Sequence, residues 1–248
     1  MDINNQEIKI LGTKVNRMSM SQTMQEITVW ANQEEKHYIC TADAYMLYLA
    51  SNDNKLQEVI NNASIVTPDS SGTILASKIC KTPINNKVSG CVLAENLCKE
   101  SSENNLRIFF LGAKPGIAET AAKKMKAKYK NMIVAGTHHG YFKDEENDDI
   151  IRLINESNAN ILFVAFGIPK QEFWIAENLP KLNVKVAMGI GGTFDVMSET
   201  VQRAPVFFQK TNLEWLYRFF QDPKKSYKLK ILPKFFIKVL KYKANNDN

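Results

Sequence analysis

Short apolar runs alternate with helical patterns along most of this chain, and this alternation restricts the fold more than any other feature of the sequence. Three of the runs, at 107–112, 161–167 and 185–192, are almost continuously apolar and end in glycine. Runs of this kind are typical of parallel strands that helices cover on both faces. The pattern predicts six strands, at 38–40, 64–67, 106–111, 132–135, 161–166 and 185–190.

The segments between these runs carry the signals that begin helices. Ser19 is followed three residues later by Gln22, which predicts a capping box. Pro115 and Pro169 each stand at the start of a helical pattern. Because strands and helices alternate, we predict a doubly wound, mostly parallel α/β fold with a Rossmann-like sheet.

The charge of the chain is unevenly distributed. Residues 203–248 hold 11 basic and 3 acidic side chains, whereas the rest of the chain holds 21 basic and 23 acidic ones. Apolar residues make up 44% and charged residues 23%, which excludes a disordered chain. We therefore predict an α/β core over residues 1–200, with a soft internal boundary near 101–105, and a basic, aromatic, helical appendage over 201–248. A basic tail on a near-neutral body favours phosphates or an anionic surface as its partner.

The four cysteines, Cys40, Cys80, Cys91 and Cys98, form no C-x-x-C pair and lie among apolar residues. Free, structural thiols in a reducing cytoplasm are the expected state. The first residues show no signal-peptide pattern, and no run approaches the ~18 apolar residues that span a bilayer. The sequence thus predicts a cytoplasmic protein that touches a membrane without crossing it.

Polar side chains follow the first two predicted strands. Thr41 and Asp43 come after the first strand, and Asp69 comes after the second, just ahead of a helix. Because ligands of parallel α/β sheets gather at the carboxyl ends of the strands, these groups could form an acid–base site. The alternative, which spacing alone favours, is that both carboxylates only cap helices.

Glycine-rich turns follow three of the later strands. The turn 112–116 lacks the full G-x-G-x-x-G pattern, so close packing of loop on sheet explains it better than phosphate binding. Gly191 and Gly192 allow a ligand to approach the backbone closely. Lys170 begins a helix, where a lysine favours a nearby anion, although solvent exposure explains it equally well. The chain has no D-x-D, Walker A or G-x-S-x-G motif, which argues against metal-held sugar nucleotides, NTPases and serine hydrolases.

The appendage ends in a basic amphipathic pattern, in which lysines surround apolar residues that recur at helical spacing. The apolar positions are Leu232, Phe235, Phe236, Val239 and Leu240. Such a helix lies well on an anionic bilayer, and we favour this over the alternative of a helix docked on the core.

Seven short motifs, all in chain order, give the sequence its resemblance to the WecG/TagA/CpsF family of glycosyltransferases. The motifs are Thr-Ala-Asp (41–43), Pro-Asp-Ser-Ser-Gly (68–72), Gly-Thr-His-His-Gly-Tyr-Phe (136–142), Gly-Ile-Pro-Lys-Gln-Glu (167–172), Gly-Gly-Thr-Phe-Asp (191–195), Arg-Ala-Pro (203–205) and Glu-Trp-Leu-Tyr-Arg (214–218). The resemblance runs from about residue 8 to residue 230. Seven collinear motifs are far more specific than any one of them alone.

The resemblance implies an enzyme that moves an N-acetylmannosamine-type sugar from a UDP donor to undecaprenyl-diphospho-N-acetylglucosamine, as in the synthesis of wall teichoic acid or another surface polysaccharide. It implies that Asp69 is the catalytic base and that Thr41 and Gln171 lie in the active site. The chain departs from the family pattern at Asp43, Ser70, Lys87 and Glu199. The alternative that the donor or acceptor sugar differs from that of the family therefore stays open.

We expect inverting transfer without a metal or another cofactor, with Asp69 taking the proton of the acceptor hydroxyl. The residues expected to hold the substrates are Thr41, Asp43, Lys87, Gln171, Gly191, Gly192, Arg203, Arg218, Lys224 and Lys225. The expected partners are the UDP-sugar, the undecaprenyl-diphosphate-linked acceptor, the anionic inner face of the cell membrane and a second copy of the chain. Nucleic acid is not expected, because the aromatic residues of the tail form one stripe instead of interleaving with its lysines. The alternative function is a catalytically altered protein that binds a UDP-sugar or a lipid-linked glycan.

Overall fold

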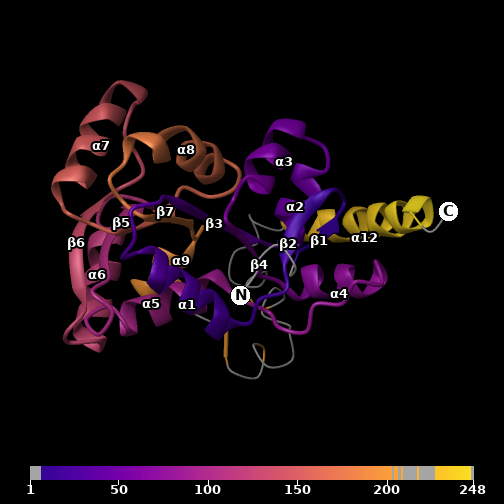
Figure 1. The fold of residues 1–248 in the computed structure, drawn as a ribbon, viewed down its shortest axis with the longest axis horizontal. Coiled ribbons are helices and arrows are strands. Elements are labelled where there is room, and N and C mark those ends of the chain that lie inside the picture. The colour runs from indigo at the N-terminus through magenta and orange to yellow at the C-terminus, as the bar shows by residue number, and fades with distance from the viewer. Residues whose placement is uncertain (1–6, 203, 206–207, 209–216, 218–226, 247–248) are drawn as a thin grey trace.

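Six parallel strands form one sheet in the order β4-β3-β8-β7-β5-β6 (Figure 1). The computed structural model describes residues 7–202, 204–205, 208, 217 and 227–246. The strands are β3 (His37–Ala42), β4 (Ile65–Pro68), β5 (Arg107–Gly112), β6 (Ile133–His138), β7 (Ile161–Ala165) and β8 (Val186–Gly189). All six correspond to predicted strands, and the predicted parallel α/β class is confirmed.

Helices cover both faces of this sheet, which explains why its strands are apolar throughout. One face carries α2 (Ala44–Ala50), α3 (Asn54–Asn61), α7 (Asn147–Glu156) and α8 (Lys170–Asn178), and the other carries α1 (Met20–Trp30), α5 (Gly90–Lys99), α6 (Ile117–Lys128) and α9 (Thr193–Met197) (Figure 1). Within β5, Phe109 and Leu111 belong to the first core cluster, and Ile108 and Phe110 belong to the second. Because successive side chains of a strand point to opposite faces, both sets must be apolar. The helix α4 (Ser71–Ile79) follows β4, and short 3₁₀ turns cover Asp144–Glu146 and Leu179–Lys181.

The helix starts predicted from the sequence are present. Ser19 caps α1 in a complete capping box, in which the Ser19 N–H donates to Gln22 Oε1 at 2.8 Å. Gly116 is the N-cap of α6 and Pro169 is the N-cap of α8. These residues set where the helices start and therefore which side chains stand at the strand ends.

A hairpin of β1 (Glu7–Ile10) and β2 (Thr13–Asn16) precedes the sheet and was not predicted. Its turn, Leu11-Gly12, has φ of 54° and 81° at the two residues, but it lacks the Asn-Gly or Asp-Gly pair that marks such turns in a sequence. Asn16 joins the hairpin to the sheet, because its Oδ1 accepts the Val66 N–H at 2.7 Å.

The last helix, α12 (Tyr227–Asn246), packs against α2 and α4 (Figure 1). Phe235 and Val239 are fully buried in the core cluster that also contains α2, and Leu232 and Phe236 are partly buried against it. The prediction that this stripe enters a bilayer is therefore wrong for Leu232, Phe235, Phe236 and Val239, which face the protein, whereas the fifth residue of the stripe, Leu240, is exposed. The periodicity of an amphipathic helix does not reveal which apolar surface it meets, and here that surface is formed by α2 and α4.

The rest of α12 presents a second, outward face. Ile237 and Leu240 are 55% and 54% exposed, whereas Lys238 Nζ donates to Ser51 O at 2.6 Å and to Asn52 Oδ1 at 2.8 Å. Of the helices that the structure describes, none combines the length and the apolar content needed to cross a membrane.

Candidate active site

A cavity of about 100 Å³ lies at the carboxyl ends of β3, β4 and β8, beside the loop that joins β7 to α8. This is the edge of a parallel sheet at which ligands bind, because the loops that leave the strands there converge. The cavity brings together six residues that the sequence singled out: Thr41, Asp43, Asp69, Gln171, Gly191 and Gly192.

The structure describes only one of the remaining expected residues, Lys87. Lys87 precedes α5 by three residues, and its side chain does not line the cavity. Four others lie outside the described residues: Arg203, Arg218, Lys224 and Lys225. The proposed phosphate-binding cations therefore stay predictions.

The two carboxylates at the strand ends have different structural roles. Asp43 caps α2, with its Oδ1 accepting the Met46 N–H at 2.7 Å, as the simple capping interpretation predicts. Asp69 does not cap the helix that follows it, because Ser70 caps α4 instead. The Asp69 Oδ1 accepts the Gly90 N–H at 2.8 Å, across 21 residues of chain. Asp69 is therefore a carboxylate at the cavity edge, oriented by the first residue of α5.

Residues at the start of α5 line the cavity, and the sequence reasoning missed them. The further lining residues are Ser89, Gly90, Cys91, Ile168, Ile190 and Thr193. The chain reaches the cavity here because the Val88 N–H donates to Pro68 O at 3.0 Å, which holds the segment before α5 beside the end of β4. A Cβ on Gly90 would lie 2.8 Å from Thr41 Cγ2, so a glycine is needed for α5 to approach β3. The Ser-Gly pair before an amphipathic pattern is the signal that could have placed this helix start.

Thr41 and Gln171 use their polar atoms to hold the loops that form the cavity. The Thr41 hydroxyl donates to Gly189 O at 2.9 Å, and the side chain is almost wholly buried. The Gln171 Oε1 accepts the N–H groups of Gly167 at 3.2 Å and Gly191 at 3.0 Å. Both residues therefore shape the walls of the cavity.

A Thr41→Val variant is expected to lower the free energy of unfolding by about 1–3 kcal/mol, because it leaves a buried carbonyl without its donor at nearly unchanged volume. Urea denaturation measures this loss. Thr41→Ser retains the hydroxyl and should stay close to the wild type. An equal loss in Thr41→Ser would show that the methyl group packed against Gly90 matters instead.

Burial keeps three titratable side chains of the core protonated: Tyr38, Cys40 and Cys98. Burial raises the pKa of the Tyr38 hydroxyl and of the Cys40 thiol well above their usual values, and the nearby Glu172 adds to both effects. Burial likewise raises the pKa of Cys98. The structure thus confirms the expected structural role for Cys40 and Cys98, whereas Cys91 is partly exposed and lines the cavity.

Two other sequence motifs have simple structural explanations. A Cβ on Gly112, where φ is +131°, would lie 2.6 Å from Ala165 O, so this glycine allows β5 and β7 to pack closely, as predicted. Lys170 is exposed, with its Nζ 5.2 Å from the centre of the Phe166 ring, which agrees with the solvent-exposed alternative.

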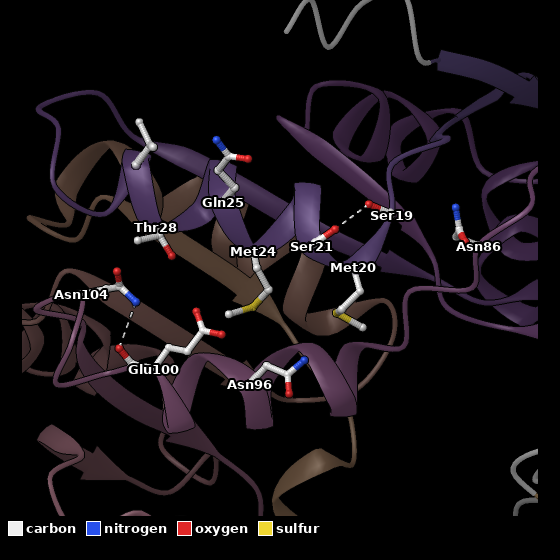
Figure 2. Close-up of a pocket in the computed structure, with 11 residues that line it drawn as sticks. Ser19, Met20, Ser21, Met24, Gln25, Thr28, Asn86, Asn96, Glu100 and Asn104 are labelled. Carbon is white, nitrogen blue, oxygen red and sulfur yellow. Dashed lines mark hydrogen bonds between the residues drawn. The ribbon is translucent and has the colours of Figure 1, made fainter.

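A groove of about 720 Å³ between α1 and α5 lies apart from these residues (Figure 2). Met20 and Met24 of α1, Asn96 of α5 and Glu100, the C-cap of α5, point into it. Glu100 is the only carboxylate among the described residues that line it, and none of the expected site residues that the structure describes is there. The small cavity at the strand ends is therefore the better candidate for acid–base chemistry.

The chain is similar to known proteins over almost its whole length. Residues 8–248 match the sequence model of the Glycosyl transferase WecG/TagA/CpsF family. A protein of Staphylococcus aureus strain MRSA252, named N-acetylglucosaminyldiphosphoundecaprenol N-acetyl-beta-D-mannosaminyltransferase, is 34% identical over 97% of this chain and 94% of its own length. Proteins of the same name from strains MW2 and NCTC 8325 are 33% identical over the same shares.

Proposed function

Since this chain belongs to the WecG/TagA/CpsF family of glycosyltransferases, we propose that it transfers an N-acetylmannosamine-type sugar from a UDP donor to undecaprenyl-diphospho-N-acetylglucosamine. The product would enter wall teichoic acid or another surface polysaccharide. The observation that carries this proposal is the convergence of Asp69, Thr41, Gln171 and the Gly191-Gly192 turn on one cavity at the strand ends.

Asp69 is the proposed general base. Its carboxylate takes the proton from the acceptor hydroxyl while the hydroxyl oxygen bonds to the anomeric carbon of the donor and UDP leaves. A single displacement of this kind inverts the anomeric configuration. The hydrogen bond from the Gly90 N–H fixes the carboxylate at the cavity edge, as a base must be held within reach of its proton.

The charge that develops on the departing UDP needs stabilisation by fixed donors and cations. The backbone at Gly191 and Gly192 borders the cavity, and a Cβ on Gly191 would meet no atom within 4 Å. We propose that Arg203, Arg218, Lys224 and Lys225 supply the positive charge. The absence of a D-x-D motif from the sequence supports transfer without a metal.

A reaction of purified protein with UDP-N-acetylmannosamine and a synthetic lipid-linked N-acetylglucosamine tests the proposal, with mass detection of the lipid product. One added N-acetylhexosamine is expected, at an unchanged rate in excess EDTA. A rate that falls with EDTA and returns with added Mg²⁺ or Mn²⁺ would contradict the metal-independent mechanism. A protein that binds the UDP-sugar without forming product would instead fit the alternative, a catalytically altered binding protein.

We also propose that the protein meets its lipid-linked acceptor at an anionic membrane surface through the outward face of α12. Ile237 and Leu240 are three residues apart on this face, and the exposed side chains of Lys230, Lys234 and Lys241 flank them. Each lysine near an anionic leaflet contributes ~1 kcal/mol to binding. This face differs from the buried stripe, so docking on the core and contact with a membrane are compatible.

A double variant, Ile237→Ser with Leu240→Ser, is expected to bind anionic vesicles at least about tenfold more weakly, because two exposed apolar side chains no longer enter the interface. Co-sedimentation with vesicles that contain phosphatidylglycerol measures the change. Leu153→Ser on α7, where the leucine is also exposed, is the matched control and should bind like the wild type. Unchanged binding by the double variant would exclude this face as the membrane contact.

A further inference from the structure

The first turn of α8 buries two adjacent polar side chains, only one of which the proposed reaction uses. Gln171 and Glu172 are 1% and 0% exposed. The Gln171 Nε2 donates to Glu172 Oε1 at 2.8 Å. Burying a carboxyl group in a protein core is costly, so its presence here calls for a role that an apolar residue could not fill.

The Gln171 amide has only one orientation that satisfies its neighbours. Its Oε1 accepts the N–H groups of Gly167 and Gly191, and its Nε2 faces Glu172. An amide presents an acceptor at one end and donors at the other. If it were turned over, its NH₂ group would face two N–H donors and its oxygen would face the Glu172 oxygen. An acceptor at position 172 therefore fixes which end of Gln171 points toward the cavity loops.

The loop at Gly191 needs such an anchor. Gly191 and Gly192 line the cavity, and Gly191 has φ of +54°. A glycine backbone can adopt many other conformations, so a hydrogen bond is needed to hold this one. On the other side of this loop, the Thr41 hydroxyl holds Gly189 O, and a Cβ on Gly189 would lie 2.7 Å from Gln171 Nε2. The amide of Gln171 thus lies directly against the backbone that ends β8.

We propose that Glu172 is a positioning residue, which fixes the Gln171 amide so that its oxygen holds the Gly191 N–H and, through it, the backbone that faces the UDP-sugar. The identity of that ligand rests on the function proposed above, whereas the hydrogen-bond chain from Glu172 to Gly191 does not. Glu172 itself touches no substrate in this scheme. Gln171 likewise acts through the loop that it holds.

An exchange of the two side chains tests this proposal. In Gln171→Glu, a second carboxylate faces Glu172 and the pair repels. In the double variant Gln171→Glu with Glu172→Gln, the carboxylate introduced at position 171 accepts both glycine N–H groups and also an N–H of the amide introduced at position 172, so the complementary pattern is restored. Glu172→Gln alone lets position 172 present either an oxygen or an NH₂ group to Gln171, so the orientation of Gln171 is fixed less strongly. Glu177→Gln, an exposed position on the same helix, is the control.

The main readout requires no catalysis. Selective ¹⁵N-glycine labelling leaves only 11 backbone signals, and hydrogen exchange at the Gly191 N–H reports its hydrogen bond directly. We expect exchange at least about tenfold faster in Gln171→Glu, an intermediate rate in Glu172→Gln, and a rate near that of the wild type in the double variant and the control. The kcat for transfer should be lowest in Gln171→Glu, intermediate in Glu172→Gln, and close to the wild type in the double variant and the control.

Two results would overturn the proposal: unchanged Gly191 exchange in Gln171→Glu, or a double variant that exchanges as fast as Gln171→Glu. If Gln171→Glu does not fold, recovery of folding in the double variant supports the pairing, and continued misfolding contradicts it. Restored exchange without restored kcat would show that the Gln171 amide contacts substrate directly and does not act through the loop. If the wild type forms no product, the proposed function fails while the exchange rates still decide the role of Glu172.

Discussion

An Asp69→Asn variant is expected to turn over about 10²–10⁴ times more slowly than the wild type, the factor that a positioned general base typically contributes. The asparagine amide cannot take the proton of the acceptor hydroxyl. Its Oδ1 can still accept the Gly90 N–H, so the start of α5 should stay in place and the unfolding midpoint should change little. Initial rates with saturating donor and acceptor measure the effect.

The control for this variant is another aspartate that accepts a backbone N–H at a helix start. Asp53 caps α3, with its Oδ1 accepting the Leu56 N–H at 3.1 Å, and it does not line the cavity. Asp53→Asn should therefore keep the wild-type rate. Near-normal turnover in Asp69→Asn would instead assign the base to another group, and Asp43 is the other carboxylate among the described residues that line the cavity.

A Phe235→Ala variant is expected to lose about 3–5 kcal/mol of unfolding free energy, the usual cost of removing a buried aromatic side chain. Phe235 is fully buried in the core cluster that includes α2, and its ring centre lies 5.2 Å from that of Phe236. Alanine would leave a cavity between α12 and the helices that it covers. Chemical denaturation monitored by circular dichroism gives the value.

Ile237→Ala is the matched control, because Ile237 lies two residues further along the same helix and is 55% exposed. Its unfolding free energy should stay within about 0.5 kcal/mol of the wild type. A loss below about 1 kcal/mol in Phe235→Ala would contradict the packing of α12 on α2 and α4.

The same packing makes a truncation near residue 200 a poor test of membrane binding, since it would also uncover the core beneath Phe235 and Val239.

The sequence predicted the sheet well, because a parallel strand that is buried on both faces leaves a run of apolar residues that no surface helix shows. It could not predict the order of the strands. The position of β8 between β3 and β7 follows from long-range packing, and this position brings Gly189 against Thr41 and Gly191 to the same cavity. The β1–β2 hairpin was missed because its Leu-Gly turn lacks the usual pair of turn residues.

The candidate site was predictable where it depends on strand ends and not where it depends on tertiary contacts. Thr41 and Asp69 come just after apolar runs, so their positions indicated them, whereas Gln171 was indicated by the resemblance to the family. Two equivalent Asp residues could not be told apart from spacing, and only the structure shows that Asp43 caps its own helix while Asp69 bonds to Gly90. Ser89 and Cys91 entered the site because the segment before α5 returns to the end of β4, which no local pattern encodes.

The helix α2 connects the cavity to α12, whose outward face is the proposed membrane contact. It begins after Asp43, at the cavity, and it ends at Ser51, whose carbonyl holds Lys238 of α12. Seven residues of helix span about 10 Å. A helix of this length is stiff. When α12 rests on a flat surface, the helix therefore fixes both the height of the cavity above that surface and the direction in which the cavity opens. An acceptor held in that surface would then be met at one fixed depth, whatever the length of its lipid.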